Sequence, residues 1–259
     1  MTGAMRYFYF FIWFLAAILY VPIFKNLYRS RWEYIDYTHA YFILPVALWL
    51  VWRMRGRLKA LFQRTPAQKG IGSLAFLAFG CLLFIFASRN DYLFLSTLSL
   101  IPFLIGLSGY LHGTETAKAL LFPVGYLLFL VPPPLGVLDS ITLPMRYGAS
   151  WATEKILMLF QYPAERAGLL LFMGGHEIFV GAPCSGFRSL ITLLSLGTAY
   201  AYVTKGGALK KTLLVASIIP LALVGNVARI VALCLITYYF GHEAGEGFFH
   251  YFSIPGYTS

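Results

Sequence analysis

The sequence has few charged residues. Lys, Arg, Asp and Glu make up only 12% of the 259 residues, whereas apolar residues make up 59%. Soluble domains carry about twice that share of charge, so the composition excludes an ordinary soluble protein and indicates an integral membrane protein. Acidic residues are scarcer than basic ones, with 10 Asp and Glu against 20 Lys and Arg, so the net charge is +10. The excess cations lie in short loops between apolar runs, where they orient a membrane protein, and nucleic-acid binding is not expected.

Cysteine is also scarce. The three cysteines, Cys81, Cys184 and Cys234, are odd in number and form no CxxC pair. Their spacing therefore supports neither a metal site nor a paired disulfide framework. The first apolar run has no small-residue cleavage site, so we interpret it as a retained helix rather than a signal peptide.

Apolar runs predict seven membrane-spanning helices, because about 20 apolar residues cross a bilayer. The predicted spans are residues 7–24, 37–52, 71–88, 92–111, 117–131, 187–204 and 212–240. The expected fold class is an all-α polytopic membrane protein in which residues 1–259 form a single membrane domain. Its expected parts are an N-terminal five-helix part (1–131), an outer-side interfacial segment (132–186), and the catalytic helices with a tail (187–259).

The loop after the second predicted span determines the expected orientation. Six cations crowd this loop: Arg53, Arg55, Arg57, Lys59, Arg64 and Lys69. The positive-inside rule places such a loop in the cytoplasm. By this count, the segment 132–186 and everything after Phe240 lie on the outer side.

The outer segment contains two predicted elements. Apolar residues at helical spacing predict a helix that lies along the membrane interface: Met145, Ala149, Ala152, Ile156 and Leu159. Residues 169–172 and 177–180, separated by the turn at Gly174 and Gly175, predict a small β-hairpin. The second strand leads to Cys184, just before an apolar helix.

The stretch GAPCSGFRSL, residues 181–190, raises the question of why a thiol stands there. A helix N-terminus favours the thiolate form of Cys184, and the thiolate is the nucleophile. Gly186 would let a substrate backbone approach, and Ser185 would cap the helix or donate a hydrogen bond at the site. The alternative is that Cys184 is a small apolar packing residue, which is our interpretation of Cys81 and Cys234.

A second unusual stretch, VGNVARIVAL, covers residues 224–233. Asn226 and Arg229 lie three residues apart, on one face of the last predicted helix. A guanidinium within an apolar helix is costly unless it meets protein or water, which makes Arg229 a functional candidate. The alternative is a structural arginine that snorkels or pairs with a carboxylate.

A histidine is the expected proton carrier, and spacing leaves four outer-side candidates open: His39, His176, His242 and His250.

Together, CSG after a hairpin, NVARI in the next long helix and a later histidine resemble the exosortase and archaeosortase family of membrane cysteine transpeptidases. The stretch DYTHAYFILPVALWLVWRMRGRL, residues 36–58, resembles the family's second helix and basic loop. The resemblance implies the catalytic residues Cys184, Arg229 and His250. Pro183 and Phe187 depart from the family's usual residues around the cysteine. Since the chain ends at Ser259, the family's further C-terminal helix is expected to be absent, and His242 is kept as a reserve candidate.

The resemblance implies an enzyme of the bacterial inner membrane whose active site faces the periplasm and which uses no metal or organic cofactor. Its substrates would be membrane-tethered proteins with a C-terminal sorting signal, cleaved through a thioacyl-enzyme and transferred to an amine acceptor that the sequence does not identify. Asn226, Ser185, Gly186 and Arg188 are the candidate substrate-binding residues, with Arg166 and Arg146 as further cations for an acidic recognition motif. Two alternatives remain open: an intramembrane protease that uses water, and a non-enzymatic subunit of exopolysaccharide export or transport.

Overall fold

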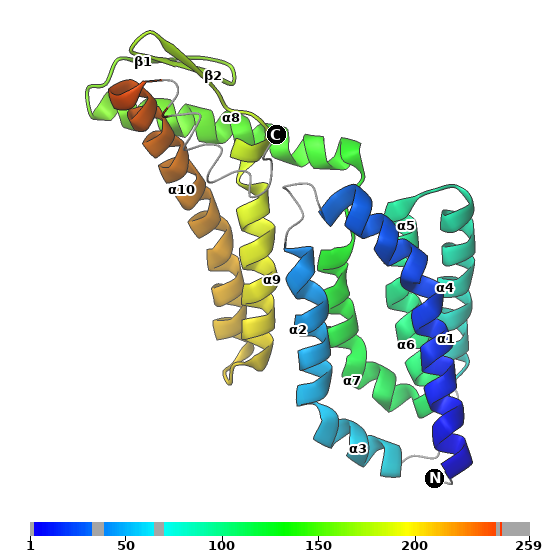
Figure 1. Ribbon diagram of the computed structural model, residues 1–259. Coiled ribbons are helices and arrows are strands. Elements are labelled where there is room, and N and C mark those ends of the chain that lie inside the picture. The colour runs from blue at the N-terminus through cyan, green and yellow to red at the C-terminus, as the bar shows by residue number, and fades with distance from the viewer. Residues whose placement is uncertain (1–2, 33–38, 65–69, 242–243, 245–259) are drawn as a thin grey trace. The chain divides into compact units, whose positions relative to one another are not determined.

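The computed structural model of the chain describes residues 3–32, 39–64, 70–241 and 244. The chain forms two compact units, Met1–Pro133 and Pro134–Ser259. Both are mainly helical, and the second also carries a small three-stranded sheet (Figure 1). The predicted class of a mostly helical membrane protein is thereby confirmed.

The first unit consists of helices. They are α1 (Gly3–Leu27) with the π-helical turn η1 (Tyr28–Trp32), α2 (Ala40–Arg53), α3 (Arg55–Arg64), α4 (Ile71–Arg89), α5 (Leu93–Leu98), α6 (Leu100–His112), α7 (Thr114–Gly125) and the 3-10 turn η3 (Tyr126–Leu130). Large apolar side chains of α1 and α4 are exposed, as expected for surfaces that face lipid. The prolines at 132–134 follow η3, where a helix cannot continue without losing backbone hydrogen bonds.

Helices α4 and α6 pack through glycines. A Cβ at Gly80 would lie 2.6 Å from the backbone nitrogen of Phe103, and one at Gly106 would overlap the backbone of Leu77. In a membrane, where lipid tails are as apolar as leucine, such close backbone approach is a principal source of helix association. The glycines therefore determine how closely these two helices approach.

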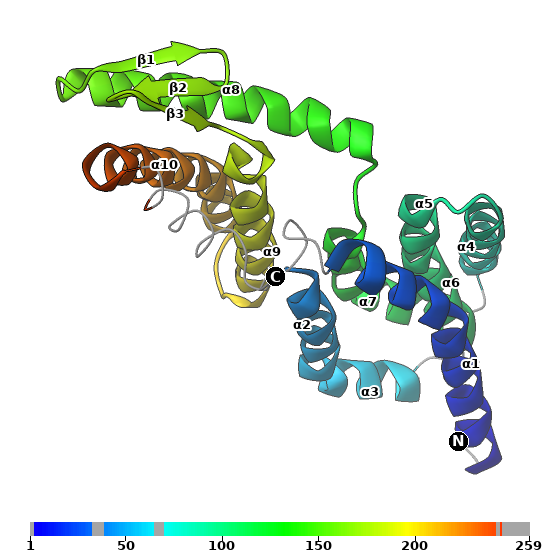
Figure 2. The ribbon, with the colours of Figure 1, turned by 45° about the horizontal axis from the view of Figure 1, so that its top comes forward.

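The second unit begins with the long helix α8 (Leu135–Leu159). It is followed by β1 (Ala164–Ala167), β2 (Leu170–Met173), β3 (His176–Phe179), the 3-10 turn η4 (Ala182–Ser185), α9 (Phe187–Val203) and α10 (Ala208–Phe240). The strands are antiparallel in the order β1-β2-β3, with Arg166 opposite Leu171 and Leu171 opposite Ile178. Figures 1 and 2 show the sheet beside α8, and α9 beside α10.

The core of this unit joins the sheet to the helices. Its buried apolar residues come from α8, all three strands, η4 and α10: Ala149, Leu157, Ala164, Leu171, Met173, Ile178, Val180, Cys184, Ile230, Leu233 and Cys234. Alternate residues of β2 face this cluster, as the two-residue period of a strand requires. Because Cys184 belongs to the cluster, the packing that holds the sheet also fixes the position of the thiol.

The predicted hairpin is observed as β2 and β3, each displaced by one residue, with Gly174 and Gly175 at positive φ in the turn. Strand β1 was not predicted. The predicted helix of the outer segment is part of α8, which begins earlier than expected, at Leu135. Its position at the membrane interface stays a prediction.

Among the described residues, four helices are long and apolar enough to cross a membrane: Tyr7–Ser30, Ile71–Arg89, Leu93–His112 and Ala208–Phe240. The other three predicted spans are helical as well, but α2, α7 and α9 have 14, 12 and 17 residues. At 1.5 Å per residue, even α9 extends only about 25 Å, against a hydrocarbon core of about 30 Å. The count of seven spans therefore stays a prediction.

The contact between α4 and α6 can be tested with alanine. Gly106→Ala is expected to lower the free energy of unfolding by about 1–3 kcal/mol, because the new Cβ overlaps the backbone of Leu77. Thermal unfolding in detergent micelles measures the effect. Gly72→Ala is the control on α4, since nothing lies within 4 Å of its Cβ, and it should be neutral or stabilising. Equal unfolding temperatures for both variants would contradict the close packing.

Candidate active site

Cys184 lies in the short turn η4, which connects strand β3 to helix α9. The turn is closed by a hydrogen bond from the backbone N–H of Cys184 to the carbonyl of Gly181, at 3.0 Å. The next two residues are also buried, and the Cys184 side chain is only 2% exposed. The thiol is therefore enclosed by protein in this state.

Helix α10 binds this turn through two polar side chains. Asn226 Nδ2 donates to the carbonyl of Cys184 at 2.7 Å, and Arg229 Nη2 donates to the carbonyl of Pro183 at 2.6 Å. Arg229 Nη2 also donates to Asn226 Oδ1 at 3.2 Å, so the two side chains support each other. The predicted shared face of Asn226 and Arg229 thus meets the Cys184 turn, which is 42 to 46 residues away in the sequence.

Gly186 makes this close approach possible. Its φ is +73°, which L-residues with a side chain rarely adopt, and a Cβ there would lie 2.7 Å from Asn226 Cγ. In the structure, the space beside Gly186 is thus taken by Asn226. Ser185 Oγ accepts a hydrogen bond from the backbone N–H of Phe187 at 3.3 Å, which satisfies one free donor at the start of α9.

Arg229 has no carboxylate partner among the described residues; the two ion pairs found there are Lys118–Glu115 and Arg166–Glu154. Its Nη2 is held by Pro183 and Asn226. The guanidinium keeps further N–H groups, and its positive charge is not neutralised by a neighbouring carboxylate in this part of the chain. Such a cation can bind an anion that forms beside it.

Burial raises the pKa of the Cys184 thiol, because a thiolate there would lose its hydration. The charge of Arg229 and a backbone hydrogen bond with Gly181 lower the pKa, but burial has the larger effect. This outcome differs from the expectation that the helix N-terminus would favour the thiolate. In the substrate-free protein, the neutral thiol is the favoured form at neutral pH.

The other predicted site residues lie in different surroundings. Arg188 is half-buried in the first turn of α9. Arg166 pairs with Glu154 at 3.4 Å and donates to the carbonyl of Gly168, so its charge is already matched. Arg146 on α8 has a buried Nε without a hydrogen-bond partner in the described part of the chain. His250 and the reserve candidate His242 lie outside the described residues.

Sequence reasoning missed the backbone acceptors of the site. The carbonyls of Pro183 and Cys184 receive the two side chains of α10, and no sequence pattern marks a carbonyl for such a role. Sequence reasoning also did not predict that Cys234 lies near the site. In the structure, its buried side chain belongs to the same apolar cluster as Cys184. A cysteine inside an apolar run carries no signal of that proximity.

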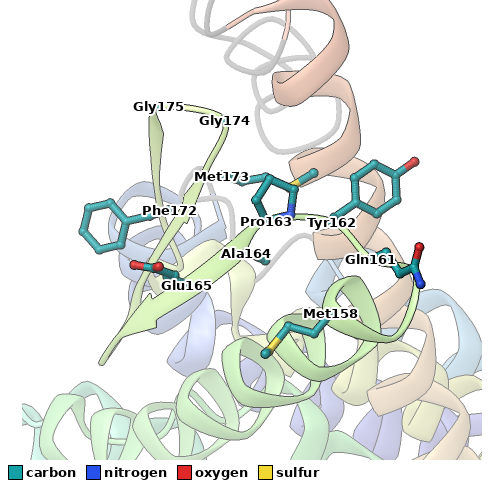
Figure 3. A pocket seen from close by; sticks show the side chains of 10 residues that line it. All are labelled: Met158, Gln161, Tyr162, Pro163, Ala164, Glu165, Phe172, Met173, Gly174 and Gly175. Atoms are coloured by element: carbon teal, nitrogen blue, oxygen red, sulfur yellow. The ribbon is translucent and has the colours of Figure 1, made fainter.

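A groove of about 620 Å³ lies elsewhere in the same unit (Figure 3). It is formed by the end of α8, by β1 and by the turn between β2 and β3, and neither Cys184 nor Arg229 lines it. The Tyr162 hydroxyl on its wall is 2.8 Å from the Tyr239 hydroxyl, close to the end of α10. The groove is therefore next to the C-terminal end of α10.

These features define a multi-pass membrane protein in which a long apolar helix fixes a buried thiol turn through an asparagine and an arginine. The family model of the transmembrane exosortase (Exosortase_EpsH) matches residues 32–253. The chain therefore belongs to the transmembrane exosortase family. Comparison with curated proteins and with solved structures gave no match.

The electrostatic effect of Arg229 on Cys184 predicts how alkylation depends on pH. Because burial raises the pKa of the Cys184 thiol, iodoacetamide should react slowly at neutral pH and faster as alkaline pH forms the thiolate. Arg229→Ala removes a charge that lowers this pKa, so the midpoint should move to higher pH. The midpoint is measured by mass spectrometry of the Cys184 peptide, which separates it from Cys81 and Cys234.

Arg188→Gln is the matched control, since it removes a cation that has no part in the pKa shift of Cys184. Its midpoint should equal that of the wild type. An unchanged midpoint in Arg229→Ala would show that the guanidinium does not act on the thiol.

Proposed function

We propose that this chain is a cysteine transpeptidase of the bacterial inner membrane, with its active site facing the periplasm. It cleaves the C-terminal sorting signal of secreted, membrane-tethered proteins and transfers them to an amine acceptor. The observation that carries the proposal is the pair of hydrogen bonds by which Asn226 and Arg229 hold the carbonyls of Cys184 and Pro183. These bonds keep the Arg229 guanidinium next to the buried thiol. Among the described residues, no carboxylate pairs with this guanidinium.

The raised pKa of Cys184 requires a base in the first step. In the proposed mechanism, a histidine accepts the thiol proton while the sulfur attacks the carbonyl carbon of the scissile peptide. The resemblance assigns this role to His250, with His242 as the reserve. The histidine then protonates the leaving amine, and the C–N bond breaks to give the thioacyl-enzyme.

Arg229 stabilises the negative charge that forms on the carbonyl oxygen during attack. The guanidinium is already oriented by Pro183 and Asn226, so little reorganisation is needed when the charge develops. Asn226 acts mainly by positioning Arg229 and the Cys184 turn. An amine acceptor then attacks the thioester and releases the acyl group, which regenerates the thiol.

Arg188 and Arg146 are proposed to recognise an acidic group in the sorting signal. Arg188 lies in the first turn of α9, directly after the Cys184 turn, and Arg146 has a buried Nε without a partner among the described residues. Arg166 is a weaker candidate, because Glu154 already neutralises it. Ser185 and Gly186 contribute by shaping the turn.

Processing of a reporter substrate tests the proposed mechanism. The reporter is a secreted protein that carries a short recognition motif, one membrane helix and a basic tail, and it is co-expressed with each variant. Cys184→Ala should abolish cleavage, and Arg229→Ala should reduce its rate by about 10²–10³, the usual effect of losing an oxyanion donor. Cys234→Ala, which removes a second buried thiol of the same cluster, is the control and should retain activity.

Mass spectrometry of the new C-terminus identifies the acceptor. An added amine mass supports transfer, whereas a free carboxylate would show hydrolysis. Normal processing by Cys184→Ala would contradict an enzyme that acts through this thiol.

The pH dependence of cleavage distinguishes the two histidine candidates. Replacing the histidine that acts as the base should reduce the cleavage rate and remove the rise in rate between about pH 5 and 8, where imidazole loses its proton. We expect this for His250→Ala and a normal profile for His242→Ala. The opposite result would assign the role to His242, and unchanged profiles in both variants would contradict a histidine base at these positions.

A further inference from the structure

The first unit contains an apolar cavity of about 720 Å³. Its walls come from α1, α2, α6 and α7, and helix α3 closes one end with Leu58 and Phe62. The volume falls within the range of about 300–1,000 Å³ that is typical of ligand sites. This cavity belongs to the unit that does not contain Cys184.

The length of the cavity corresponds to one leaflet of a bilayer. Along α1 it is lined from Trp13 to Phe24, and along α6 from Leu100 to His112. At 1.5 Å per residue, these stretches extend about 16–18 Å, roughly half of the 30 Å hydrocarbon core.

The α3 end of the cavity is polar and aromatic. His112 lies there, where its Nε2 accepts a hydrogen bond from Trp13 Nε1 at 3.3 Å and its ring contacts Phe62, with 4.6 Å between ring centroids. On the neighbouring end of α2, Trp52 is exposed and carries the Arg55 guanidinium at 4.0 Å above its ring. Exposed tryptophan beside arginine is typical of the level at which hydrocarbon meets headgroups.

Helix α3 presents positive charge at the same end. Leu58 faces the cavity, and the exposed cations Arg57 and Lys59 lie on either side of it on the helix surface. The nearest described acid on α7, Glu115, is paired with Lys118 at 2.8 Å and does not oppose them. Figure 1 shows α3 lying across the end of α2, beside the first turns of α7.

We infer that this cavity binds one lipid with an anionic phosphate headgroup. Its acyl chains fill the apolar space along α1 and α6, and Arg57 and Lys59 bind the phosphate. By the positive-inside rule, this lipid belongs to the cytoplasmic leaflet. The cations that set the orientation of the chain would thus also form a specific lipid site.

Native mass spectrometry of the purified full-length protein tests the headgroup. The detergent-solubilised protein is titrated with phosphatidylglycerol and, separately, with phosphatidylcholine of the same acyl chains. We expect one tightly bound phosphatidylglycerol and weaker binding of the zwitterionic lipid. Arg57→Gln together with Lys59→Gln should weaken phosphatidylglycerol binding by about ten- to thirty-fold, since each basic residue near a membrane surface contributes about five-fold.

Lys205→Gln together with Lys210→Gln is the matched control, because it removes two exposed cations, one from the connection between α9 and α10 and one from the first turn of α10. This variant should bind phosphatidylglycerol like the wild type. Equal affinity for the two lipids, or the same loss in both double variants, would overturn the proposal.

Filling the cavity tests the position of the acyl chains. Ala17 lines the cavity and is exposed to it, so Ala17→Trp should occupy the space and reduce binding of the lipid at least ten-fold. Ile18→Trp, at the next position and outside the lining, is the control. Leu104→Phe is a milder filling variant for use if Ala17→Trp does not fold. Full lipid occupancy in a folded filling variant would overturn the proposal.

Discussion

The second unit depends on the hydrogen bonds between helix α10 and the turn that carries Cys184. Two polar side chains of an apolar helix, Asn226 and Arg229, meet two consecutive carbonyls of a buried turn. Each group would be costly in these surroundings without the other, since a buried polar atom without a partner costs several kcal/mol in an apolar medium. The polar groups of the helix and of the turn therefore satisfy each other's hydrogen-bonding needs, and their pairing fixes where the thiol lies.

The same arrangement sets the chemistry of the thiol. Burial in the apolar cluster stabilises the neutral form of Cys184, while Arg229 favours the thiolate, and burial dominates in the substrate-free state. A thiol of this kind is protected from unwanted oxidation, because the thiolate is the reactive species. Under the proposed function, a thiol in this state would require a base for attack on a substrate, which is a physical reason for the histidine in the proposed mechanism.

The sequence predicted most features that repeat along the chain. Apolar runs located the helices, and the Gly174–Gly175 turn located the hairpin. Strand β1 was missed because Glu165 and Arg166 interrupt any alternation, and its pairing with β2 comes from tertiary structure. For the site, the shared face of Asn226 and Arg229 followed from helical spacing. Their acceptors did not, because every residue has a carbonyl and only the fold selects two of them.

The basic residues of α3 illustrate a further limit of sequence reasoning. Counted by sign alone, Arg57 and Lys59 only orient the chain in the bilayer. The structure adds that they flank Leu58, at one end of an apolar cavity about one leaflet deep. Orientation needs only a sum of charges, whereas lipid binding needs those charges at a fixed place relative to an apolar space. The second property comes from the packing of α3 against α2 and α7, two helices that are far apart in the sequence.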